Sequence, residues 1–311
     1  MLLSKAIQGF TLAYRLNHAQ ATTDLYRKAL NHLARYLHDP PVERITSTDL
    51  QRYIHHLRTE YIPPRVRASN RQGQPLSNWA INNRIKAIRA FFAWAQQEAI
   101  VKRNPARGLA QIKIQRAQPA PFTEDEVRRL LHAAEYTQHA NRRVRRPTWR
   151  RNTALIIVLL DTGIRVGELC RLKIANVRLE AAELHIRPFG SGRKSRARTI
   201  PLGKTARRAL WRYLSSIEDP DPADSFFDLT PKSVRNLLHR IGKAAGVPHT
   251  HPHRFRHTFA IEYLRSGGDI FTLQRILGHA TLDMVRWYLH IVQTDLAAAH
   301  RRASPADRWR L

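Results

Sequence analysis

The sequence predicts two globular domains: an α-helical first domain and a mainly helical, α+β second domain with a small antiparallel sheet. The length of 311 residues is enough for two domains that each bury a core. Apolar residues recur at helical spacing in both halves, and only short stretches of the second half alternate as strands do. Residues 112–122, with Pro119 and Pro121, interrupt this pattern, which predicts a linker between domains of residues 1–111 and 123–311.

The first domain is predicted to consist of amphipathic helices. One helix begins at the start signal of residues 46–49, and the clearest one follows Ser77, a predicted N-cap. Its apolar stripe consists of Ile81, Ile85, Ile88, Phe92 and Ala95. Asn82, Lys86 and Arg89 form a polar stripe on the same helix. Such a stripe suits contacts to phosphates, and a merely solvated basic face is the alternative.

The second domain is predicted to open with a helix, because Thr123 and Glu126 form a capping-box pair. The arginine-rich run of residues 142–151 interrupts the helical pattern and is predicted to be an exposed loop. Strands are predicted near residues 184–186 and 199–202, joined by a Gly-rich basic turn. The remainder is predicted to be mostly helical.

The charge of the chain indicates its partner. It has 53 Lys and Arg against 24 Asp and Glu, a formal net charge of +29 with histidine neutral. Nucleic acid is the usual polyanion for such an excess, because cations that neutralise phosphates release condensed counterions. A basic protein without a specific partner and a membrane-surface protein are the alternatives. The sequence shows neither a long uncharged apolar run nor a secretory signal, so no membrane span is expected.

The cysteine count limits the kinds of site that the protein can form and the cellular compartment that is expected. Cys170 is the single cysteine, so neither an internal disulfide nor a zinc site built from cysteines can form. Its apolar neighbours predict a small buried side chain, and a reducing, cytoplasmic location is expected.

Three segments of the second domain carry the chemistry: Thr162–Leu169, His253–Ala260, and Leu277–His279 followed by Tyr288. Their order, spacing and apolar surroundings resemble the catalytic domain of the tyrosine recombinase, or phage integrase, family. The resemblance covers residues 123–295 and extends more loosely to the first domain, whose Phe-Phe-Ala-Trp and Asn-Pro-Ala sequences are similar to the core-binding domain of that family.

The resemblance implies roles for five side chains. Breaking a phosphodiester builds negative charge on its non-bridging oxygens, and Arg165 and Arg256 would hold that charge as fixed guanidinium forks. Glu168 would lie on the helical face of Arg165 and orient it. His253 would act on protons at the reacting centre, and His279 would donate a hydrogen bond to the phosphate.

Tyr288 is the predicted nucleophile. A tyrosine among apolar residues is ordinarily a packed core residue, and only its distance from the Leu-Gly-His segment marks it. Tyr213 and Tyr263 are alternatives without that motif. In the family a hairpin lysine protonates the leaving 5′ oxygen. Lys194 is the only lysine of the predicted turn, although counting back from the following strand puts Arg193 in that slot, and a guanidinium is a poor proton donor.

A metal site is the rival interpretation of the histidines. Four of them cluster, at His249, His251, His253 and His257. The last two have a spacing that can place two imidazoles on one helical face. No glutamate completes an HExxH arrangement, and the neighbouring Arg254 and Arg256 would repel a cation. Neither a metal nor another cofactor is therefore expected.

The expected activity is site-specific recombination of double-stranded DNA. The resemblance implies a 3′-phosphotyrosyl intermediate, a dimer on each site, a tetramer in the synapse and a Holliday junction, with accessory proteins possible. The short chain favours a simple, Xer-like recombinase. A catalytically inactive DNA-binding protein of the same fold, and a topoisomerase-like nicking-closing enzyme, are the alternatives. The target sequence, and the choice between integration, excision and dimer resolution, are open.

Overall fold

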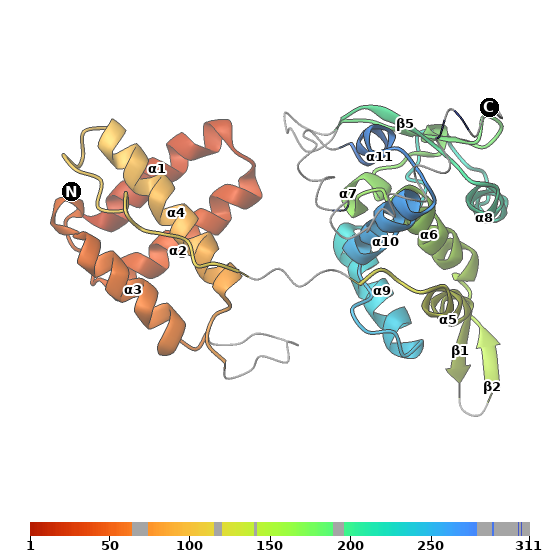
Figure 1. Ribbon diagram of the computed structural model, residues 1–311, viewed down its shortest axis with the longest axis horizontal. Helices are drawn as coiled ribbons and strands as arrows, with labels where there is room; N and C mark the ends of the chain where they lie inside the picture. The colour runs from red at the N-terminus through yellow and green to blue at the C-terminus, as the bar shows by residue number, and fades with distance from the viewer. Residues whose placement is uncertain are drawn as a thin grey trace. The chain divides into compact units, whose positions relative to one another are not determined.

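The computed structural model divides the chain into two compact units, Met1–Ala117 and Gln118–Leu311 (Figure 1). We call them the N-terminal and C-terminal units. The structure describes residues 1–63, 74–114, 120–139, 142–188 and 196–278, and in addition Tyr288, Ser304 and Ala306. Within these residues no helix is both long enough and apolar enough to cross a membrane.

The N-terminal unit is helical, as predicted. Its elements are α1 (Leu3–Asn17), α2 (Gln20–Tyr36), a 3-10 turn (Val42–Arg44), α3 (Ser47–Thr59) and α4 (Asn78–Gln97). Local capping sets two of the starts. The Thr46 hydroxyl accepts from the Asp49 backbone N–H, and the Ser77 hydroxyl accepts from that of Ala80. The predicted apolar stripe of α4 is fully buried in the core of this unit.

Asn82 does not belong to an exposed polar stripe, contrary to prediction. Its side chain is buried, donates to the carbonyl of Ile112 at 2.9 Å and accepts from the Ile112 N–H at 2.8 Å. A buried amide must satisfy both its donor and its acceptor, and the Ile112 backbone supplies both partners. Asn82 therefore fixes the chain leaving this unit to α4. Lys86 and Arg89 are exposed, as expected.

The C-terminal unit contains seven helices and two small sheets among its described residues. The helices are α5 (Glu124–Glu135), α6 (Trp149–Thr162), α7 (Val166–Leu169), α8 (Lys204–Leu214), α9 (Pro231–Ala244), α10 (Pro252–Arg265) and α11 (Ile270–Leu277). The buried helix α6 packs against α5, α8 and α10 and so forms the centre of the unit. The predicted capping box of Thr123 and Glu126 is present at the start of α5.

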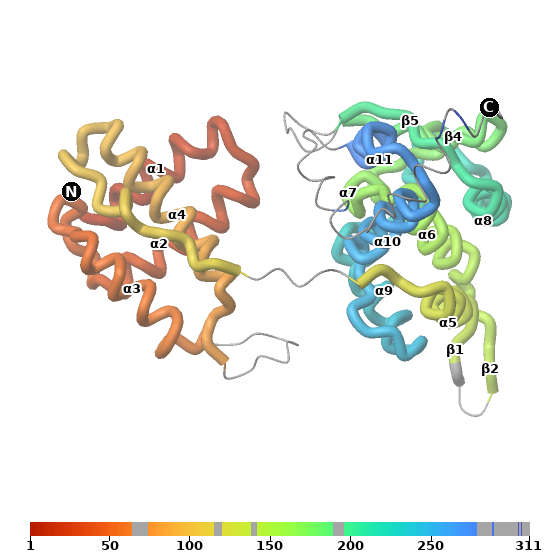
Figure 2. Tube along the Cα trace, in the orientation of Figure 1, coloured from red at the N-terminus to blue at the C-terminus, as the bar shows by residue number. Residues whose placement is uncertain are grey.

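A three-stranded antiparallel sheet consists of β3 (Val177–Arg178), β4 (Glu183–Ile186) and β5 (Arg198–Pro201) in the order β3-β4-β5, after a 3-10 turn (Ile174–Asn176). The two predicted strands correspond to β4 and β5. Leu184 faces Ile200 across this pair, and both are buried in the core. The chain trace in Figure 2 shows β5 passing beside α11, although the two are distant in the sequence.

The arginine-rich run of residues 142–151 is not a loop, contrary to prediction. It forms β2 (Arg142–Arg145), paired antiparallel with β1 (Tyr136–His139), and then enters α6. All four residues of β2 are exposed. A strand without a buried face has no apolar alternation, so its pairing left no hydrophobic pattern in the sequence.

Candidate active site

The turn between α6 and α7 positions Arg165. Gly163 ends α6 in the left-handed conformation, with φ of 58°. A Cβ at this glycine would lie 2.5 Å from the Phe259 ring and 2.9 Å from the Leu277 side chain. Only glycine combines this backbone conformation with so close an approach. The turn thereby brings Arg165 at the start of α7 against the end of α11.

Arg165 and Arg256, the two predicted phosphate ligands, meet at one backbone carbonyl. The Leu277 oxygen accepts from Nη1 of Arg165 at 3.3 Å and from Nη2 of Arg256 at 2.8 Å. Arg256 also donates to the Gly163 carbonyl at 2.7 Å, and Arg165 to the Gly278 carbonyl at 3.4 Å. Two guanidinium groups remote in the sequence thus converge beside the segment that leads to residue 279.

Glu168 is a buried carboxylate that accepts hydrogen bonds from two arginines, Arg165 and Arg198. Its carboxylate accepts from the Arg165 backbone N–H at 3.1 Å and from Nη1 of Arg165 at 3.3 Å. Arg198 of β5 donates to the same carboxylate at 3.0 and 2.8 Å, and its Nε donates to the Ile276 carbonyl at 2.6 Å. The Glu168 and Arg198 side chains are only 1% and 8% exposed. Burial alone would raise the pKa of Glu168, but the two guanidinium groups and the backbone N–H hold it below its ordinary value.

Arg256 is a buried cation. Burial, with the positive charge of Arg165, lowers its pKa to about 9. It therefore stays protonated at neutral pH but in an environment that disfavours its charge. A phosphate placed against this pair would reverse that effect, because an opposite charge favours the protonated guanidinium.

Tyr288 lies against α10 and α11. It is 3% exposed and packs in an apolar cluster with Ala260, Ile261, Leu264, Leu273 and Leu277. Its hydroxyl oxygen is 2.8 Å from Nδ1 of His257. Burial raises the pKa of Tyr288, and the charges of Arg256 and Arg165 partly oppose that shift. The phenol is therefore protonated at rest, with an imidazole at hydrogen-bonding distance.

His257 is a site residue that the sequence interpretation missed. Burial, with the charges of His253, His251 and Arg256, lowers its pKa to about 4, so the ring is neutral at neutral pH. A neutral imidazole at this distance can accept a hydrogen bond from the phenol. The signal available in the sequence was its position directly after Arg256, one helical turn beyond His253. From the sequence alone, His257 is only a candidate metal ligand.

The other histidines of this region have separate positions. His253 is exposed in the first turn of α10, and partial burial of its ring, with the charges of Arg256, Arg235 and Arg165, lowers its pKa. His251 is the N-cap of α10, where its Nδ1 accepts from the Arg254 N–H at 3.2 Å.

The described residues contain no group of three or more side chains able to hold a metal ion. The predicted His279, Lys194 and Arg193 lie outside the described residues. The C-terminal tail beyond Tyr288 is likewise described only at Ser304 and Ala306.

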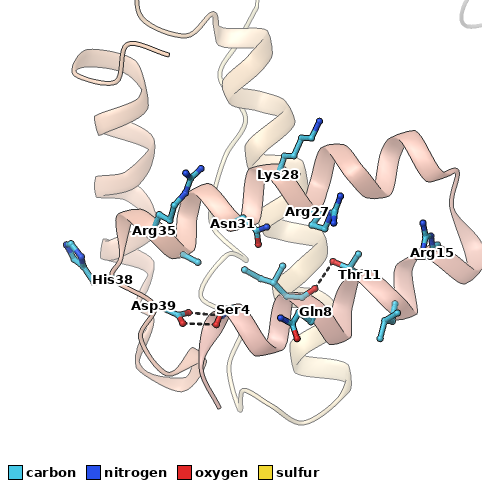
Figure 3. Close-up of a pocket in the computed structure, with 13 residues that line it drawn as sticks. Ser4, Gln8, Thr11, Arg15, Arg27, Lys28, Asn31, Arg35, His38 and Asp39 are labelled. Atoms are coloured by element: carbon cyan, nitrogen blue, oxygen red, sulfur yellow. Dashed lines mark hydrogen bonds between the residues drawn. The ribbon is translucent and has the colours of Figure 1, made fainter. Parts of the chain in front are cut away.

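A large hollow of the described surface lies in the N-terminal unit. It is a groove of about 1030 Å³ between α1 and α2, which Figure 3 shows in close-up. Its basic lining residues are Arg15, Arg27, Lys28, Arg35 and His38. Arg15 is hydrogen-bonded to Gln20 and Arg27 is paired with Asp24, whereas Lys28 and Arg35 are exposed. This groove is positively charged, but it contains none of the arginine, histidine and tyrosine side chains described above near the end of α11.

Comparison with known proteins agrees with this geometry. The family described as "Phage integrase family" matches residues 121–294, more than half of the chain, and "Phage integrase SAM-like domain" matches residues 2–114. Tyrosine recombinase XerC of Bacillus pumilus is 26% identical over 303 residues, covering 93% of this chain and 92% of that protein. XerC of Mycobacterium sp. strain KMS is 33% identical over 233 residues, covering 71% and 75%.

Solved structures share the fold. The Tn1549 transposon integrase, in complex with a circular intermediate DNA, matches with a TM-score of 0.74 at 19% identity, covering 97% of this chain and 99% of that one. A lambda integrase dimer bound to a core site matches with a TM-score of 0.70 at 19% identity, covering 91% and 97%. The family matches and the XerC relatives together show that the chain belongs to the phage integrase family and is a site-specific tyrosine recombinase of the Xer-like type.

Proposed function

We propose that the C-terminal unit cleaves and rejoins double-stranded DNA, with Arg165 and Arg256 as the clamp for the scissile phosphate. The observation that carries this proposal is their convergence on the carbonyl of Leu277, a residue that packs in the same apolar cluster as Tyr288. An incoming phosphate oxygen would accept hydrogen bonds from the same N–H groups that donate to the Leu277 carbonyl at rest. The two guanidinium cations would offset the negative charge that develops on the phosphate during attack.

In the proposed reaction the Tyr288 oxygen attacks phosphorus, the bond from phosphorus to the 5′ oxygen breaks, and a 3′-phosphotyrosyl linkage forms. The phenolic proton passes to His257, which lies 2.8 Å away, or to His253 at the exposed start of α10. Lys194 protonates the leaving 5′ oxygen, and His279 donates to the phosphate. The phosphodiester bond is exchanged for another ester, so religation by the reverse attack requires neither a nucleotide cofactor nor a metal.

We propose residues 1–111 as the core-binding domain, residues 112–122 as the linker and residues 123–311 as the catalytic domain, with both domains binding the duplex. The exposed Lys28 and Arg35 of the α1–α2 groove would contact phosphates of the core site (Figure 3). Recombination of two DNA sites would require a dimer on each site and a tetramer that holds the two sites together. A Holliday junction would form after the first pair of strands is exchanged and before the second. We also propose a cytoplasmic location, because the proposed substrate is cellular DNA.

The decisive test is covalent capture of DNA. Wild-type protein is incubated with a pool of nicked duplexes of randomised sequence, so that release of a short fragment traps the linkage. We expect a denaturant-resistant adduct that Tyr288→Phe abolishes while DNA binding is retained. Tyr263→Phe is the matched control, because Tyr263 packs against the same apolar cluster, and it should leave adduct formation intact. An adduct formed by Tyr288→Phe would refute the assignment of the nucleophile, and sequencing the captured DNA identifies the target.

A further inference from the structure

The β1–β2 hairpin carries a concentration of positive charge that the active site does not use. Arg142, Arg143 and Arg150 are exposed and belong to a run of six arginines within residues 142–151. Among the described residues, Glu135 is the one acid paired with this run, through Arg145 at 2.7 Å. Figure 1 shows the hairpin extending away from the helices of its unit. It adds no buried side chain from β2 to the core.

Aromatic rings hold several of these arginines in place. The Arg143 guanidinium lies 3.9 Å from the centre of the Tyr136 ring, and that of Arg150 lies 5.1 Å from the Trp149 ring. The Arg145 guanidinium lies 4.8 Å from the centre of the Trp149 ring and donates to the Tyr136 hydroxyl at 3.1 Å. Stacked guanidinium groups lose less side-chain entropy on binding than free ones, and their N–H edges stay available. The arrangement is typical of a prepared anion-binding surface rather than of a solvated charge run.

The hairpin stands at the opposite end of α6 from the candidate active site. Helix α6 begins at Trp149 directly after the hairpin and ends at Thr162, just before Gly163 and Arg165. Its 14 residues span about 20 Å at 1.5 Å per residue. This equals about six base pairs of duplex at 3.4 Å per base pair. The hairpin is therefore too far away to reach the scissile phosphate.

We propose that the β1–β2 hairpin, together with the first turn of α6, is an auxiliary DNA-binding arm that contacts backbone phosphates about six base pairs or more from the cleavage point. This inference rests on the proposed function, since it requires DNA on the C-terminal unit. Arg143 and Arg150 form the contact surface, with Tyr136 and Trp149 as its platforms. The arm contributes affinity without sequence preference, because phosphates carry no base identity.

The test measures binding of the full chain to a 40-base-pair duplex of random sequence at salt concentrations between 50 and 200 mM. Arg143→Gln/Arg150→Gln removes two cations from the arm. The matched control is Arg128→Gln/Arg265→Gln, which removes two exposed cations that are already paired with Glu124 and Glu262 on their own helices. Arg143→Lys/Arg150→Lys keeps the charge. Circular dichroism checks the fold of each variant, and the nicked-duplex assay reports whether cleavage persists.

We expect Arg143→Gln/Arg150→Gln to lower the slope of log affinity against log salt by about 2, while the lysine variant and the control stay near wild type. Wild-type binding should accordingly weaken about tenfold more than that of the glutamine variant across this salt range. Adduct formation should persist in every variant. The proposed DNA-binding arm would be refuted by an unchanged salt slope or by an equal change in the control variant. It would also be refuted if mass photometry showed that the substitutions alter only self-association. None of these results would contradict the recombinase chemistry. Failure of the wild type to bind DNA would instead refute the proposed function.

Discussion

Removing Arg198 should destabilise the C-terminal unit and displace Arg165, one of the two proposed phosphate ligands. Arg198 comes from β5, Glu168 from α7 and the Ile276 carbonyl from α11, so one guanidinium ties three elements together. In Arg198→Met, four hydrogen bonds are lost, and two of them are the bonds that Arg198 donates to the buried Glu168 carboxylate. The space that Arg198 fills also borders Gly278, where a Cβ would lie 2.9 Å from its Nη1.

The expected magnitude follows from burial. Breaking a buried ion pair by removing one partner costs about 3–5 kcal/mol, because the remaining charge loses its compensation. Exposures of 1% for Glu168 and 8% for Arg198 place this pair in that class. For a unit of this size, about 2–4 °C of melting temperature is lost per kcal/mol, which predicts a decrease of about 6–20 °C.

Differential scanning calorimetry of the full chain measures this decrease. Arg196→Met is the matched control, since Arg196 is an exposed neighbour of the same type, and it should change stability by less than about 0.5 kcal/mol. The double variant Glu168→Gln/Arg198→Met should be less destabilised than the two single variants combined, by at least about 1 kcal/mol. A loss below about 1 kcal/mol for Arg198→Met, or strict additivity in the cycle, would refute the role assigned to the pair.

Three further outcomes are expected. Gly163→Ala should lower stability by about 1–3 kcal/mol in urea unfolding, because alanine is strained at φ of 58° and its Cβ would lie 2.5 Å from Phe259. Asn82→Ala should cost about 1–3 kcal/mol by the same measurement, since it leaves the Ile112 N–H and carbonyl without their partner. Because the folded-state pKa of Glu168 is depressed, its contribution to stability should be complete above the ordinary carboxyl pKa of 4.5 and disappear as the pH falls through the lower folded value. A pH titration of the urea midpoint checks this, and Glu168→Gln should remove that component of the curve.

The local features of the fold were predictable because they depend on neighbouring residues. The caps at Thr46, Ser77 and Thr123 are each formed by a side chain and a backbone N–H three residues later. The apolar stripe of α4 is a helical period and is buried as expected. The β1–β2 hairpin was missed because its exposed strand has no alternation, and pairing across a two-stranded ribbon leaves little trace in composition.

The site was predictable in its residue types but not in its contacts. Arg165, Arg256 and Tyr288 carry recognisable motifs, and the structure brings all three to the end of α11. Arg198 carried no such signal, because an arginine in so basic a chain is ordinarily exposed. Its burial depends on Glu168, which lies 30 positions away.

The sequence by itself determined the helical character of both units, the basic surface suited to a polyanion, and the order of guanidinium, imidazole and phenol groups that marks a tyrosine recombinase. Only the tertiary structure decided that His257 is the imidazole against the Tyr288 hydroxyl, that Asn82 faces the chain leaving its unit, and that Arg198 lies beneath the clamp. The physical reason is that periodicity and capping are local, whereas burial of a polar side chain depends on which partner a distant segment brings to it.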